Sequence, residues 1–236
     1  MAVILNIDTS TTVCSAALSA EGMILTHNED FEGRNHAALL SGMIKGCLDR
    51  AAELELNIDA IAVSMGPGSY TGLRIGLSEA KGLAYGLKIP LIGVDTLQLL
   101  SVEVMFSADI EEDAILVPMI DARRMEVYTA AYDLALEPLM KPQALILDAE
   151  SYGDLIATKR PIYMFGDGSD KARQIFSTDN VHFVADIKPL ATSMVALAER
   201  EFLRRNFLDV AYSTPTYLKD FQATAPNPLK GVKTAP

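Results

Sequence analysis

The sequence predicts an internally duplicated α/β protein with two lobes, because one order of elements occurs twice along its 236 residues. An apolar strand that ends in an aspartate stands at residues 4–8 and again at 117–121. Further along each half, the segments 63–69 and 163–169 both lead from an apolar strand into a Gly-x-Gly-Ser turn. Both matches lie in the same order, which favours duplication over chance.

The first half alternates strands and helices. Apolar residues recur at helical spacing between Leu40 and Ala51, which gives a helix with one broad buried face. The glycine-rich run from Gly66 to Gly72 marks a turn between a strand and a helix. The expected strands are 2–8, 13–18, a third just after Gly22, 59–65 and 90–94, and the expected helices are 36–56, about 71–86 and 96–106.

The second half repeats this plan. Residues 127–132 stand where 13–18 stood, and a helix is expected from about Thr192 to Arg205. An acidic, loop-like segment at 107–113 marks the boundary between the lobes, and the proline-containing end resembles a mobile tail. The predicted domains are an N-terminal lobe at 1–106, a C-terminal lobe at 107–219 whose last helix could pack back on the first, and a mobile tail at 220–236.

Composition and charge exclude several classes of protein. Half of the residues are hydrophobic and 22% are charged, which is typical of a globular chain. The formal net charge of −11 is unsuited to direct nucleic-acid binding, and no apolar run approaches the roughly 20 residues of a membrane helix. Cys14 and Cys47 lie in apolar stretches without a metal-ligand spacing. We therefore expect a cytoplasmic protein without disulfides or a zinc site.

The two Asp-bearing hairpins could face each other as a nucleotide cleft. The first offers small hydroxyl donors beside Asp8, which could sit near a metal ion. The second suits phosphate poorly, because two arginines follow Asp121 and no glycine does. Alternatively, both aspartates only cap strand ends. The residues assigned to this vestigial cleft are Asp8, Thr9, Ser10, Thr11, Asp121, Arg123, Gly166 and Gly168.

The run from Gly66 to Gly72 could place backbone N–H groups where an anion binds at a helix N-terminus. It lacks the Lys-Ser/Thr pair of a Walker loop, and its glycine spacing differs from the dinucleotide fingerprint. Asp95 nevertheless ends the next strand, where a Rossmann unit carries a ribose-binding carboxylate. A tight structural turn and a dinucleotide site therefore both remain open.

Small residues recur every four positions on the two long first-lobe helices. A glycine in a helix interior costs about 1 kcal/mol, so close packing should offset it. That packing could be against the chain's own sheet or, because the opposite faces also look apolar, against another protein. The predicted partner interface comprises Leu39, Gly42, Met43, Gly46, Tyr70, Gly72, Leu73, Gly76, Leu77 and Ala80.

The usual catalytic sets are missing from the sequence. Its three histidines occur in no metal-ligand spacing, and Ser69 does not stand in a G-x-S-x-G nucleophile motif. No nucleophile has a plausible base. We therefore assign no catalytic residue and no metal ligand.

Several segments carry a family resemblance. They are the strand and turn at 4–11, the glycine-rich string at 66–76, His36, the hairpin at 121–128 and Pro-Thr-Tyr-Leu-Lys at 215–219. In these segments the chain resembles the TsaB (YeaZ) family. The resemblance implies a duplicated actin-like ATPase fold (ASKHA, ribonuclease H-like), with mixed sheets flanked by helices.

The resemblance also implies a function. The family's members are non-catalytic dimerisation subunits that act with a TsaD-type paralogue and a TsaE-type ATPase, transferring threonylcarbamoyl to the adenosine beside the anticodon of tRNA. It implies that helices 36–56 and 71–86 meet the TsaD-type partner. The stripes of small residues on these helices lead us to expect that the chain pairs with a second copy when that partner is absent. ATP and metal would then belong to the partners, and tRNA would be met only through the complex.

Two rival functions are kept. The first is a stand-alone ATP-dependent, kinase-like enzyme that uses Asp8 and Asp121 at magnesium, and the second is a nucleotide-cofactor protein that uses the glycine-rich loop. An older glycoprotease-like naming of the family also exists. The missing metal-ligand spacing argues against peptidase activity in this chain.

Overall fold

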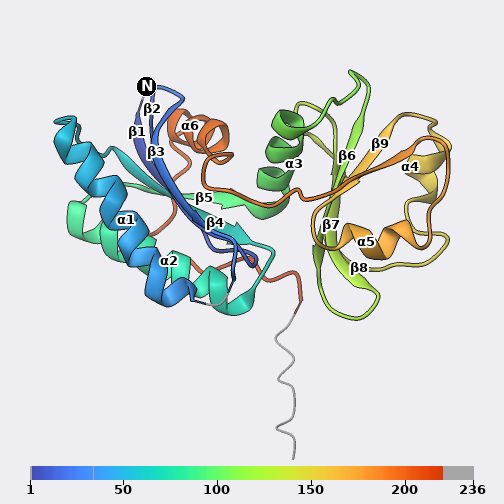
Figure 1. Ribbon diagram of the computed structural model, residues 1–236, viewed down its shortest axis with the longest axis horizontal. Helices are drawn as coiled ribbons and strands as arrows, with labels where there is room; N and C mark the ends of the chain where they lie inside the picture. Colours follow the sequence, from blue (N-terminus) through green and yellow to red (C-terminus); the bar gives the residue numbers. More distant parts are fainter. Residues whose placement is uncertain (1, 34, 220–236) are drawn as a thin grey trace, which may run out of the picture.

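The computed structural model describes residues 2–33 and 35–219. The expected tail at 220–236 lies outside the described residues. Two five-stranded sheets form the centres of two lobes, which stand side by side in Figure 1. The strands of the first sheet are β1 (Val3–Asp8), β2 (Cys14–Ala20), β3 (Met23–Asp30), β4 (Ala60–Gly66) and β5 (Leu91–Asp95). Those of the second are β6 (Ile115–Asp121), β7 (Glu126–Tyr132), β8 (Pro138–Ile146), β9 (Ile162–Phe165) and β10 (Val181–Val184).

The two sheets share one topology. The first has the strand order β3-β2-β1-β4-β5, with β1 antiparallel to β2 and parallel to β4. The second has the order β8-β7-β6-β9-β10, with β6 antiparallel to β7 and parallel to β9. Strands β1 to β5 of the first sheet thus correspond, in that order, to strands β6 to β10 of the second. The duplication predicted from the sequence is confirmed.

The helices differ between the lobes. The long helices α1 (His36–Glu53) and α2 (Tyr70–Leu87) pack on the first sheet, whereas α4 (Gly153–Ala157) and α5 (Ser169–Arg173) of the second lobe have five residues each. Two further helices, α3 (Thr96–Ser107) and α6 (Val195–Leu203), contribute to the apolar cluster that spans the two lobes. The last helix is shorter than the predicted 192–205, because residues 191–194 form turns. Of the helices in the described ranges, none is long and apolar enough to cross a membrane.

The cores show how the lobes are joined. One apolar cluster lies between the first sheet and α1 and α2, and another lies between the second sheet and its short helices. A third cluster spans both lobes and includes Ile92 of the first sheet, Leu97 of α3, Phe165 of the second sheet and Ala198 of α6. In sequence α6 belongs to the second half, yet it packs against β1 and β5 of the first sheet. The apolar cluster around α3 and α6 therefore holds the two lobes together.

After α6 the chain returns along the first lobe as an irregular segment with several turns, residues 204–219, which we call the strap. The backbone N–H of Leu208 donates to the carbonyl of Leu91 at 2.8 Å, and that of Thr216 donates to the carbonyl of Met65 at 2.7 Å. These bonds bring the end of the strap to the carboxyl ends of the central strands, where the two lobes face each other.

Candidate functional site

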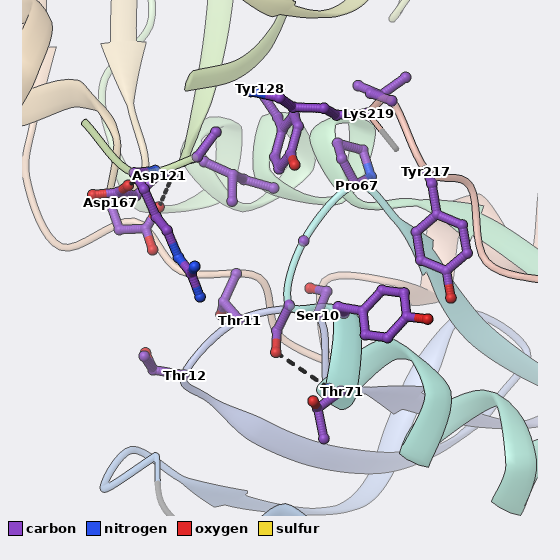
Figure 2. A pocket seen from close by; sticks show the side chains of 18 of the residues that line it. Ser10, Thr11, Thr12, Pro67, Thr71, Asp121, Tyr128, Asp167, Tyr217 and Lys219 are labelled. Carbon is purple, nitrogen blue, oxygen red and sulfur yellow. Dashed lines mark hydrogen bonds between the residues drawn. The ribbon is translucent and has the colours of Figure 1, made fainter. Parts of the chain in front are cut away.

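A cleft of about 1270 Å³ lies between the lobes (Figure 2). The first lobe contributes the turn at 10–12 and the loop at 67–71, and the second contributes the hairpin at 120–126. The end of the strap, 216–219, lines the cleft as well. The geometry therefore brings together Ser10, Thr11, Asp121 and Arg123 of the predicted cleft.

The first hairpin does not offer its aspartate to this cleft. Asp8 is fully buried, and its Oδ1 accepts the hydroxyl of Ser10 at 2.8 Å. Burial raises the pKa of Asp8 to about 6, although hydrogen bonds from Ser64 and Ser10 offset part of the rise. Thr9 is buried too, and its hydroxyl donates to the carbonyl of Gly72 at 2.8 Å. The prediction that Asp8 and Thr9 line the cleft is wrong, because the turn folds over them and α2 packs against Thr9.

The second aspartate is already paired. Lys171 Nζ lies 2.8 Å from Asp121 Oδ1, and the backbone N–H of Asp121 donates to Asp167 Oδ1 at 2.8 Å. In Figure 2 the two carboxylates lie together at the wall of the second lobe. Arg123 lies on the same hairpin and is exposed. Asp121 therefore faces the cleft as half of an ion pair.

The glycines of the second half serve packing. Gly166 has φ +93°, and a Cβ there would lie 2.3 Å from the carbonyl oxygen of Met119. A Cβ at Gly168 would lie 3.0 Å from the carbonyl carbon of Ile120. Neither glycine lines the cleft, so their assignment to it is wrong. Both let the turn after β9 lie against β6.

The glycine-rich loop of the first lobe also serves packing. A Cβ at Gly68 would lie 2.2 Å from the carbonyl oxygen of Ser10, and the N–H of Ser69 donates to that same oxygen at 2.6 Å. The side chain of Ser69 caps α2 by accepting the N–H of Gly72 at 3.2 Å. The loop thus holds the start of α2 against the first hairpin, as the tight-turn interpretation expects.

Asp95 does not act as a ribose-binding carboxylate in this arrangement. Its Oδ1 accepts the N–H groups of Leu97 and Gln98 at 2.8 and 3.0 Å and so caps α3. Burial raises the pKa of Asp95 to about 6. Within residues 2–33 and 35–219, no group of three or more His, Cys, Asp or Glu side chains could hold a metal ion.

Five residues of the predicted partner interface are buried within the first lobe. A Cβ at Gly72 would lie 2.1 Å from the carbonyl oxygen of Thr9, and a Cβ at Gly76 would lie 2.3 Å from its hydroxyl. The small residues of α2 therefore allow close packing on the chain's own hairpin. The placement of the following residues on the protein surface is wrong: Gly72, Leu73, Gly76, Leu77 and Ala80.

The remaining five are at least partly accessible. Leu39 and Gly42 of α1 are exposed, and Met43, Gly46 and Tyr70 are half-buried. No atom lies within 4 Å of a Cβ built at Gly42, whereas one at Gly46 would meet Asn28 of β3 at 3.3 Å.

Beside these residues runs a groove of about 720 Å³, lined mainly by α2 and closed on one side by Ala37 of α1. Besides Ala37 and Tyr70, it is lined by Thr71, Arg74, Ile75, Ser78, Glu79, Gly82 and Leu83. The sequence interpretation missed most of this groove, because it followed the stripe of Gly72, Gly76 and Ala80 on the other side of the helix. The repeat of Ile75, Gly82 and Leu83 at helical spacing was the available signal. We call this surface the α2 groove.

Known proteins resemble the chain over most of its length. The family model described as "TsaD: tRNA N6-adenosine threonylcarbamoyltransferase" matches residues 29–226. The tRNA threonylcarbamoyladenosine biosynthesis protein TsaB of Bacillus subtilis is 30% identical over 227 residues, which cover 94% of this chain and 96% of that protein. The chain belongs to the TsaB (YeaZ) family. TsaB of Escherichia coli is 28% identical over 92% of this chain and 94% of its own.

Solved structures agree with this membership. YeaZ from Pseudomonas aeruginosa has a TM-score of 0.75 and 28% identity, covering 92% of this chain and 100% of its own. A second Pseudomonas aeruginosa protein, described as similar to peptidase YEAZ, has a TM-score of 0.76 and 26% identity over 93% of this chain and 100% of its own. The TsaB resemblance and the duplicated α/β fold with two lobes are therefore confirmed. Membership connects the chain with tRNA threonylcarbamoyladenosine biosynthesis.

Proposed function

We propose that this chain is a non-catalytic scaffold subunit that acts with a TsaD-type paralogue and a TsaE-type ATPase. The complex would transfer threonylcarbamoyl from threonylcarbamoyl-AMP to N6 of the adenosine beside the anticodon, in tRNAs that read codons beginning with A. The observation that carries the proposal is the α2 groove, whose surface glycine, Gly82, has no packing reason among the residues that the structure describes.

The glycines of α2 fall into two kinds. Gly72 and Gly76 are explained by the close approach of Thr9, but in the described part of the chain no atom lies within 4 Å of a Cβ built at Gly82. An exposed helical glycine costs about 1 kcal/mol relative to alanine. A partner helix that packs closely over Gly82 would account for it. Tyr70 and Arg74 line the same groove, and tyrosine and arginine are enriched in protein interfaces.

The interlobe cleft supports a non-catalytic role. Asp8 is fully buried and does not line the cleft, and Asp121 is held by Lys171. The family resemblance assigns ATP and a metal ion to the TsaD-type and TsaE-type partners, and the state of these two aspartates agrees with that assignment. With a formal net charge of −11, this chain would meet tRNA only through the complex.

A second candidate function is the stand-alone kinase-like enzyme, which the size of the interlobe cleft favours. It predicts micromolar ATP binding by the isolated chain. Isothermal titration calorimetry with ATP and magnesium distinguishes the two candidates, because the scaffold proposal predicts no heat of binding at that concentration.

The test of the scaffold proposal is light scattering behind size exclusion, on the chain alone and mixed with the TsaD-type protein of the same source, with and without ATP. We expect a one-to-one complex or a dimer of such complexes, and a homodimer when the partner is absent. Gly82→Arg should abolish both the complex with the TsaD-type protein and the homodimer, because the arginine side chain fills the α2 groove without a clash among the described residues.

Gly86→Arg is the matched control. Gly86 lies on the same helix, also has no atom within 4 Å of a built Cβ, and lies outside the α2 groove. Complex formation that survives Gly82→Arg as well as it survives Gly86→Arg would contradict the proposed interface. A wild-type chain that never co-migrates with the partner would contradict the proposed function itself.

A further inference from the structure

The strap is bound firmly to the first lobe before it reaches the cleft. Lys81 Nζ of α2 donates to the carbonyls of Ala211 and Ser213 at 2.9 and 3.1 Å. A little further on, Thr216 is bonded to β4, and its carbonyl oxygen would lie 2.8 Å from a Cβ at Gly66. The backbone of the strap is thus fixed on α2 and β4 up to residue 216.

The next residue joins the strap to the α2 groove. The ring of Tyr217 lies 5.1 Å from that of Tyr70, centroid to centroid, and its hydroxyl accepts a hydrogen bond from Arg74 Nε at 3.0 Å. The Arg74 guanidinium in turn lies 4.0 Å from the centroid of the Tyr70 ring. Tyr70 and Arg74 both line the α2 groove, and Tyr217 lines the interlobe cleft beside Tyr70. These three side chains form the shared wall of the two hollows.

Two residues later the strap crosses to the second lobe. Lys219 Nζ lies 2.6 Å from Oε2 of Glu126, the first residue of β7. Of the ion pairs among the described residues, this is the one that bridges the mouth of the cleft. The apolar cluster around α3 and α6 joins the lobes elsewhere. The strap therefore connects the two lobes across the mouth of the cleft.

We infer that the strap couples docking on the α2 groove to the spacing of the two lobes, through Arg74, Tyr217 and the Lys219–Glu126 ion pair. This inference rests on the proposed function, because it concerns the same partner surface. A partner on the groove covers Tyr70 and Arg74 and so restricts the side chains that hold Tyr217. Holding Tyr217 keeps Lys219 within reach of Glu126. By thermodynamic linkage, breaking the ion pair must then weaken docking, although neither of its residues lines the groove.

The first arm of the test measures lobe spacing in the full chain without a partner. Spin labels at Ala52→Cys on α1 and Asp154→Cys on α4 stand at opposite ends of the molecule, and both positions are exposed. The two native cysteines are buried and should stay unlabelled. Double electron–electron resonance should give a narrow distance distribution for the wild-type strap and a broader one with a longer mean for Lys219→Met and for Glu126→Gln.

The conservative variant Lys219→Arg should restore the narrow distribution, because it keeps the ion pair with Glu126. A loss of folding would not be rescued in this way. If the two neutralising variants give the wild-type distribution, the strap does not hold the lobes and the inference fails.

The second arm measures the affinity of the TsaD-type protein by calorimetry. An exposed ion pair of this kind is worth up to about 1 kcal/mol, so Lys219→Met should weaken docking about two- to fivefold. Tyr217→Phe, which removes the acceptor for Arg74, should weaken it to a similar extent, and Lys219→Arg should bind as the wild type.

The outcomes separate the two proposals. Broadened lobe spacing with unchanged affinity contradicts the coupling and leaves the scaffold role intact. Wild-type affinity that is lost with Gly82→Arg and reduced with Lys219→Met supports both. If the wild-type chain does not bind the TsaD-type protein at all, the proposed function fails and the coupling fails with it.

Discussion

The two lobes share a strand order but differ in the helices that cover their sheets. Helices α1 and α2 have 18 residues each, whereas α4 and α5 of the second lobe have five. In both lobes the strands of the shared sheet topology contribute to the apolar core. The lobes differ in the helices that pack on these sheets. Among residues 2–33 and 35–219, a surface built from two long helices occurs only on the first lobe, which is why we place the partner there.

The two Asp-bearing hairpins also differ between the lobes, in the surroundings of their aspartates. Asp8 of the first is sealed beneath Ser10, whereas Asp121 of the second is held by Lys171 at the edge of the cleft. Equivalent positions in the duplicated plan thus have different electrostatic environments. Neither environment leaves the carboxylate free in the cleft. The difference between the lobes can be tested at individual positions.

The largest expected effect contrasts two glycines of α2. Gly72→Ala should destabilise the chain by about 3 kcal/mol, because the added Cβ meets the backbone of Thr9 at 2.1 Å. Gly82→Ala should stabilise it by about 0.5–1 kcal/mol, because alanine favours the helix and no atom obstructs the methyl group. Urea unfolding measures both changes. Equal effects at the two positions would contradict the division of α2 into a packed face and an open face.

The next effect concerns the pH dependence of stability. Burial raises the pKa of Asp8 to about 6, so the folded state retains this proton to a higher pH than the unfolded chain does. The stability that the protonated side chain of Asp8 contributes is fully present below about pH 4 and is lost as the pH rises through 6. Asp8→Asn, which stays neutral, should therefore be more stable than the wild type at pH 8 by about 3 kcal/mol.

That difference should shrink towards pH 5 when urea unfolding is repeated at several pH values. Asp95, whose pKa burial also raises to about 6, is present in both proteins, so their difference isolates Asp8. A difference that is independent of pH would show that Asp8 is ionised normally in the fold.

The smallest effect belongs to the second hairpin. Asp121→Asn should cost only about 0.5 kcal/mol, because its ion pair with Lys171 lies at an exposed edge. The destabilisation caused by Asp121→Asn should be smaller still in high salt, because salt screens exposed ion pairs. Unfolding at low and high salt checks this. A cost of several kcal/mol would contradict the contrast drawn between the two hairpins.

Much of the fold was predictable because it rests on short-range patterns. Apolar strands that end in aspartate, and a Gly-x-Gly-Ser turn in each half, identified the duplication before any contact was known. The lengths of α4 and α5 were not predictable, since a repeated plan fixes the order of elements and not how far a helix extends.

The candidate site was harder to predict. A stripe of small residues has the same appearance whether it meets the chain's own backbone or a partner, and Thr9 decides that for Gly72 and Gly76. The path of the strap was not predictable either: residues 215–219 carried a family resemblance, but much of the anchoring of the strap depends on backbone hydrogen bonds such as that from Thr216 to Met65. Bonds of this kind join segments distant in sequence and leave no periodic pattern in the side chains.

Hydrogen–deuterium exchange of the full chain, with and without the TsaD-type protein, tests most directly whether the first lobe alone carries the partner surface. We expect added protection in α1 and α2 and unchanged exchange in α4 and α5. Protection confined to the second lobe, with α1 and α2 unaffected, would contradict the division of roles between the lobes.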